Sequence, residues 1–135
     1  MENGPYQLYQ NLVDDGHLEA DPAQDSAARK LQDLAERLQD YEPPAKSDFF
    51  ALFSRRKDKA PKGLYLHGGV GRGKTMLMDL FFEAVNFEPR RRIHFHEFMG
   101  EVHELIGRFR KQQDGDPLPA TAQALASEAR LLCFD

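Results

Sequence analysis

Cysteine is scarce in this chain: Cys133 is the only one among 135 residues, which excludes an internal disulfide. A single thiol fits a reducing compartment. Residues 1–5 have neither the positive charge nor the apolar run of a secretory leader, and they are not rich in Arg and Ser like a transit peptide. No stretch approaches the roughly 18–20 apolar residues that span a bilayer. We therefore expect a cytoplasmic protein without a membrane span.

An excess of positive charge is also lacking, because 18 Lys and Arg face 22 Asp and Glu for a net charge of −4. Such a chain is not built for bulk nucleic-acid binding. The basic residues between 55 and 62 are better read as a solvated connector than as a phosphate or nucleic-acid contact. Hydrophobic residues make up 41% of the chain, which is enough for a core and argues against wholesale disorder. The length corresponds to about one domain.

The N-terminal part has helical signals. Residues 5–15 predict a short helix that stops near Gly16. A longer helix then begins, with Asp21 as N-cap, Pro22 at the first helical position and Gln24 closing a capping box. Apolar residues recur at helical spacing until Pro43-Pro44, which ends the helix.

From Gly63 onward the pattern alternates between strand and helix. Three short apolar runs predict strands, at 64–67, 92–96 and 131–134. Three segments predict helices, at 75–86, 98–109 and 120–130, and the first is apolar nearly all round, as in a helix inside a larger fold. This order predicts an α/β fold of parallel βαβ units, preceded by an N-terminal helical segment.

One motif carries chemistry. Its eight residues fit G-x-x-x-x-G-K-[ST] in full: Gly68, Gly69, Val70, Gly71, Arg72, Gly73, Lys74 and Thr75. Successive backbone N–H groups must curl around a triphosphate, and glycines allow both the dihedral angles and the close approach. The helix that follows adds the positive end of its dipole. We expect ATP as the nucleotide, Lys74 at its β- and γ-phosphates and the Thr75 hydroxyl on Mg²⁺.

A second part of the site is predicted at Asp135. An apolar strand that ends in an acid places a carboxylate at the carboxyl edge of the sheet, where it is suited to hold Mg²⁺, mostly through water. Gln24 is better explained by the capping box than by contact with adenine. His94 and His96, placed on one strand face, are better explained by packing than by a metal, and Cys133 is predicted to be inert core.

Several segments resemble the ZapE group of AAA+ ATPases, the bacterial cell-division ATPase and its mitochondrial relatives. The resemblance rests on residues 63–79, on the Arg-Arg-Ile-His-Phe-His-Glu-Phe-Met run at 91–99, on 131–135 and on Asp-Pro-Ala-Gln at 21–24. It implies a P-loop NTPase sheet, ATP hydrolysis, cytoplasmic residence and association with the tubulin-like division filament. Mitochondrial relatives are tied to protein quality control, and the full-length protein is expected to form a homo-oligomer.

The sequence departs from that family after Asp135, where family members continue with a Glu and further strands. We expect an N-terminal helical segment and basic connector at 1–60 and an incomplete P-loop ATPase domain at 61–135, which binds ATP with little turnover. The resemblance places the strand at 64–67 between two later strands, so within this chain it lacks a parallel neighbour.

Two alternatives remain open. A P-loop kinase-like phosphotransferase would pair the strand at 64–67 directly with 131–134. A non-catalytic, nucleotide-regulated interaction module would use the N-terminal helices to engage a partner.

Overall fold

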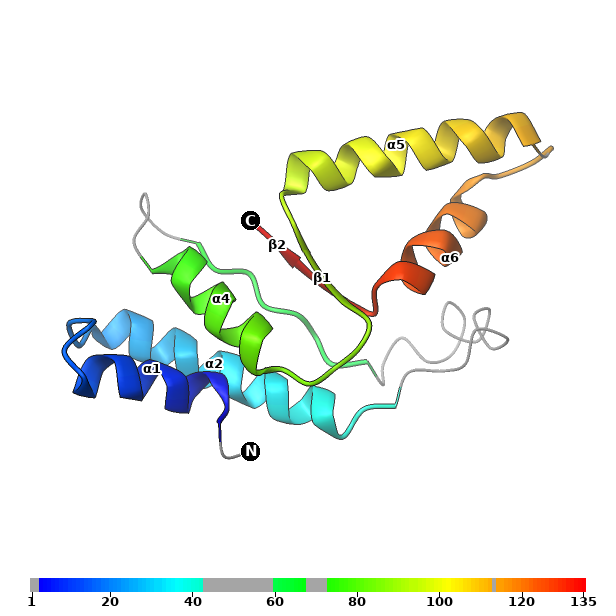
Figure 1. Cartoon of the computed structure of the whole chain (residues 1–135). Helices are drawn as coiled ribbons and strands as arrows, with labels where there is room; N and C mark the ends of the chain where they lie inside the picture. Colours follow the sequence, from blue (N-terminus) through cyan, green and yellow to red (C-terminus); the bar gives the residue numbers. More distant parts are fainter. Residues whose placement is uncertain (1–2, 43–59, 68–72, 113) are drawn as a thin grey trace. The chain divides into compact units, whose positions relative to one another are not determined.

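A computed structural model describes residues 3–42, 60–67, 73–112 and 114–135 (Figure 1). These residues form two compact units. The first contains residues 3–42, 60–67 and 73–86, and the second contains 87–112 and 114–135. The described part holds five helices and two parallel strands, an α/β content that agrees with a partial AAA+ domain.

The first unit begins with two helices, α1 (Pro5–Asp14) and α2 (Pro22–Gln39), which pack against each other. Both start with a proline, whose fixed φ suits the first helical turn. Gly16, with φ of +78°, lies just after α1, as predicted for its stop signal. The predicted N-cap of α2 is confirmed, because the Asp21 carboxylate accepts from the N–H groups of Ala23 and Gln24.

The third helix of this unit, α4 (Lys74–Ala84), packs on both α1 and α2. The apolar positions predicted at helical spacing make the core between these helices. Its buried side chains are Tyr9, Ala28, Leu31, Leu34, Ala35, Leu38, Leu77, Leu80 and Phe81. Met76 and Met78 are only half-buried, so part of the apolar surface of α4 remains uncovered in the described residues.

The segment before the phosphate loop differs from its prediction. Residues 61–67 are neither helix nor strand, and the Tyr65 side chain is 86% exposed. A strand needs a neighbour to accept and donate its ladder hydrogen bonds. Within the described residues 131–134 pairs with 90–93, whereas 64–67 belongs to the other unit, so the kinase-like pairing of 64–67 with 131–134 stays a prediction. The expected lack of a parallel neighbour for 64–67 likewise stays a prediction.

The second unit is a β–α–α–β arrangement. It consists of β1 (Arg90–Ile93), α5 (Phe95–Gln112), α6 (Leu118–Glu128) and β2 (Leu131–Phe134). The two strands pair in parallel, with Arg90 opposite Leu131 and Ile93 opposite Phe134. Strand β1 ends earlier than predicted, and His96 lies in the first turn of α5. The prediction that His94 and His96 share a strand face is therefore wrong.

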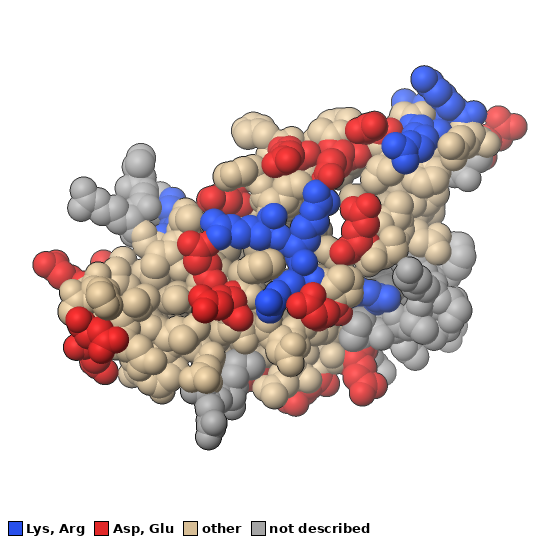
Figure 2. All heavy atoms as spheres, viewed as in Figure 1, with Lys and Arg blue, Asp and Glu red and all other residues tan. Residues whose placement is uncertain are grey.

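Ion pairs connect β1 to its surroundings. Arg91 lies 2.8 Å from Glu101 of α5 and 3.5 Å from Glu128 of α6, so one guanidinium joins a strand to two helices. This pairing raises the pKa of Arg91 and lowers the pKa of Glu101. Arg90 pairs with Glu88 at 3.3 Å. Figure 2 shows acidic side chains next to basic ones.

Candidate functional site

The carboxyl half of the predicted phosphate loop lies in the described chain. Gly73 is the N-cap of α4, Lys74 is its first residue and Thr75 its second. Residues 68–72, which include Gly68, Gly69, Val70, Gly71 and Arg72, lie outside the described residues. Gly73 has φ of +110° and ψ of −25°, a left-handed conformation that only glycine adopts readily.

The start of α4 suits an anion. The Gly73 carbonyl accepts the first intrahelical bond, from Leu77 N–H at 2.8 Å. Intrahelical bonds therefore do not use the N–H groups of Gly73 to Met76, which point along the positive end of the helix dipole. The first turn contains no acidic residue, and Gly73 at the N-cap has no side chain with which to cap the helix. Thr75 is exposed and Lys74 is half-buried at this end.

Asp135 lies where the sequence placed it, at the carboxyl end of β2. Its backbone N–H donates to the Ile93 carbonyl at 3.2 Å, and its carbonyl accepts from Phe95 N–H at 3.1 Å. Its carboxylate faces two basic side chains, Arg92 Nη2 at 3.6 Å and His94 Nδ1 at 3.9 Å. This role of Arg92 was not predicted, because it depends on the register of the parallel pair, in which Arg92 lies opposite Cys133.

Mg²⁺ prefers oxygen ligands in an octahedral shell and commonly takes only one or two from protein beside a nucleotide. The Thr75 hydroxyl and the Asp135 carboxylate are oxygen ligands of this kind. They lie in different units, so their convergence on one ion stays a prediction. The residues that the structure describes contain no group of three or more His, Cys, Asp or Glu side chains able to hold a metal.

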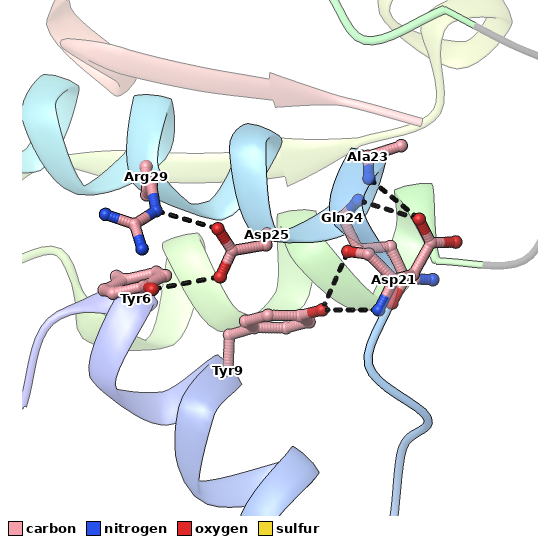
Figure 3. A network of polar contacts seen from close by, with 7 residues as sticks. All are labelled: Tyr6, Tyr9, Asp21, Ala23, Gln24, Asp25 and Arg29. Atoms are coloured by element: carbon pink, nitrogen blue, oxygen red, sulfur yellow. Dashed lines mark hydrogen bonds and ion pairs between the residues drawn. The ribbon is translucent and has the colours of Figure 1, made fainter.

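A polar network fixes the beginning of α2 (Figure 3). The Tyr9 hydroxyl donates to the Asp21 carbonyl at 3.3 Å and accepts from the Asp21 N–H at 3.5 Å. One turn further on, Asp25 accepts from the Tyr6 hydroxyl at 2.9 Å and from Arg29 Nε at 2.8 Å. The Arg29 hydrogen bond, and then that of Tyr6, lower the pKa of Asp25.

This network leaves the Gln24 side chain in a position that the sequence did not predict. The Asp21 N–H donates to Tyr9 rather than to Gln24, so the second half of the predicted capping box is wrong. The Gln24 carboxamide instead lies against Gly73: a Cβ built on Gly73 would meet Gln24 Nε2 at 2.5 Å. Residues 24 and 73 are far apart in sequence, so no local pattern could have revealed the contact.

A pocket of about 370 Å³ lies on the first unit, and it is unsuited to a polyphosphate. Asp14, Asp21 and Asp25 are among its lining residues, and their negative charge disfavours an anion. Its remaining lining residues are Tyr9, Gln10, Val13, Ala20 and Pro22. The start of α4, which has no acid in its first turn, is the better candidate.

Comparison with known proteins assigns the family. The model of the AFG1-like ATPases matches residues 4–135. The chain belongs to the AFG1-like ATPase family. Among curated AFG1-like relatives, cell division protein ZapE of Escherichia coli K12 is 37% identical over 97% of the chain and 37% of its own length. The uncharacterized protein C115.02c of Schizosaccharomyces pombe is 33% identical over the whole chain and 36% of its own length.

A third relative, lactation elevated protein 1 homolog B of Danio rerio, is 41% identical over 58% of the chain and 18% of its own length. The chain thus spans little more than a third of the length of the E. coli and S. pombe relatives. No solved structure matches it. None of the helices in the described residues is both long and apolar enough to cross a bilayer.

Proposed function

We propose that this AFG1-like chain binds MgATP through residues 68–75 and that the full-length protein hydrolyses ATP. The observation that carries the proposal is the start of α4. There, a left-handed glycine precedes Lys74 and Thr75 at a helix N-terminus whose first turn contains no acidic residue. A helix N-terminus of this kind, following a glycine-rich segment, is an anion site by its backbone alone. Family membership supports ATP as the anion.

In this proposal each residue has a distinct role. The first-turn amides and Lys74 hold the phosphates, and the Thr75 hydroxyl and the Asp135 carboxylate supply oxygens to Mg²⁺. The metal, when bound, neutralises charge on the phosphate oxygens. Arg92 and His94, which face the Asp135 carboxylate, orient it at the carboxyl end of the sheet.

We also propose that the 135-residue chain by itself turns over little ATP. Hydrolysis requires a group that positions or polarises the attacking water. In the described sheet the residues that follow β1 and β2 are His94 and Asp135, and Asp135 is already assigned to the metal. The division of the chain into a helical segment at 1–60 and an incomplete ATPase domain at 61–135 also stays a prediction.

The biological setting is carried over from relatives. The E. coli relative is named a cell division protein, which supports a role in cell division. Cytoplasmic residence, homo-oligomerisation of the full-length protein and association with the tubulin-like division filament are parts of the proposal. Co-sedimentation with that filament, with and without ATP, tests the partner, and absence of the chain from the pellet under both conditions would exclude it.

The test of ATP binding is Lys74→Ala, measured by isothermal titration with MgATP. We expect affinity to fall by at least roughly tenfold, because hydrogen bonds to charged groups contribute about 1.5–3 kcal/mol each. Lys111→Ala, which removes an exposed lysine from the last turn of α5, is the matched control and should bind like the wild type. Unchanged affinity in Lys74→Ala would show that the site assignment is wrong.

A further inference from the structure

We propose that Gln24 is a positioning residue of the phosphate site: from the first turn of α2 its carboxamide braces Gly73 and thereby fixes the start of α4. This inference rests on the proposed function, because it concerns the same anion site. It adds a link between the N-terminal helices and the phosphate loop.

The contact between Gln24 and Gly73 is close. A Cβ on Gly73 would lie 2.5 Å from Nε2, 3.2 Å from Cδ and 3.5 Å from Cγ of Gln24. The carboxamide end of the side chain thus lies directly against the Gly73 α-carbon, with no room for a methyl group between them. The φ of +110° favours glycine at 73, and a Cβ there would also force the Gln24 side chain to shift.

Hydrogen bonds fix the backbone at the start of α2, where Gln24 lies. Asp21 caps the α2 N-terminus through the N–H groups of Ala23 and Gln24 itself, at 2.8 Å and 3.5 Å. The Tyr9 hydroxyl of α1 forms hydrogen bonds with both the N–H and the carbonyl of Asp21. Tyr6 of α1 holds Asp25, the next residue after Gln24. Two tyrosines of one helix therefore fix the first turn of another (Figure 3). From that turn the Gln24 side chain reaches Gly73.

The start of α4 determines where the amides of Lys74 and Thr75 point. Anion sites built from backbone amides need their donors held within about 0.5 Å by surrounding groups. Packing of α2 on α4, with Gln24 against Gly73, supplies that support from outside the loop. A neutral amide suits the place, because a carboxylate there would repel a polyphosphate.

The decisive experiment measures the affinities of wild type, Gln24→Ala and Gln24→Glu for three magnesium complexes, those of ATP, GTP and inorganic triphosphate. We expect Gln24→Ala to weaken binding of all three by the same factor, roughly threefold to tenfold, which corresponds to on the order of 1 kcal/mol of lost binding free energy. Gln24→Glu should weaken all three further.

Gln24→Glu also separates binding from folding. A Glu in the first turn of α2 favours that helix through its dipole, so helix content by circular dichroism should not fall. Gln39→Ala is the matched control, because Gln39 is an exposed glutamine at the last residue of the same helix. It should bind all three ligands like the wild type.

Two outcomes would overturn the inference while the proposed function stands, with Lys74→Ala still impaired. One is a loss confined to ATP, which would mean that Gln24 reads the adenine base. The other is equal binding by Gln24→Ala and Gln39→Ala. If the wild type bound none of the three ligands, the proposed function would fail and this inference with it.

Discussion

Replacing Asp21 by alanine should loosen the first turn of α2 without unfolding the rest of the helix. The Asp21 carboxylate accepts from Ala23 N–H at 2.8 Å and from Gln24 N–H at 3.5 Å. Only the first of these is a hydrogen bond of ordinary length. We therefore expect Asp21→Ala to lower the stability of the helix start by about 1 kcal/mol, the typical loss when an N-cap is removed. A local opening that becomes easier by about 1 kcal/mol speeds amide exchange roughly fivefold.

Hydrogen exchange of the amides of Ala23, Gln24 and Asp25, followed residue by residue by NMR, is the assay. Asp21→Asn should exchange like the wild type, because Asn caps as well as Asp. Asp33→Ala is the second control, since it removes an exposed aspartate of the same helix that pairs with Arg37 at 3.0 Å. Unchanged exchange in Asp21→Ala, or an equal rise in Asp33→Ala, would refute the assigned cap.

Three further predictions follow from the two units. The pKa of Asp25 lies below its ordinary 3.8 because Arg29 and Tyr6 donate hydrogen bonds to its carboxylate. This carboxylate therefore stabilises the first unit above about pH 4, and that stabilisation is lost as the pH falls through the lowered pKa. Arg29→Gln should raise the pKa of Asp25 in an NMR titration, and an unmoved pKa would contradict the pairing. Burial raises the pKa of Cys133, so iodoacetamide should modify the native chain more slowly than the chain in urea, and equal rates would contradict its burial. The isolated chain should melt broadly and bind an apolar dye, because α5 has no buried residue and Phe95 and Leu118 are 51% and 56% exposed; a sharp cooperative melt without dye binding would contradict this.

The sequence predicted the elements whose signals are local. Pro5, Gly16, Asp21 and Pro22 mark helix boundaries through their own backbone preferences, and the structure confirms helices at those places. The parallel pair of β1 and β2 and the place of Asp135 at its end also agree with the alternating pattern.

Features that depend on distant partners were not predictable. Leu64 to His67 have strand-like composition, but a strand forms only where another strand pairs with it, and in the described residues 64–67 is not part of a strand. His96 lies in α5, because β1 ends at Ile93 and the helix already begins at Phe95. The orientation of Gln24 depends on Gly73, which is 49 positions further along the chain, from 73 minus 24.

The most direct test of the account follows the backbone amides of residues 68–75 in the ¹⁵N-labelled chain during titration with MgATP, magnesium triphosphate and adenosine. If these amides wrap a polyphosphate, their resonances should shift with both phosphate ligands and remain in place with adenosine. Resonances of Gly73, Lys74 and Thr75 that do not move with either phosphate ligand would contradict the central claim.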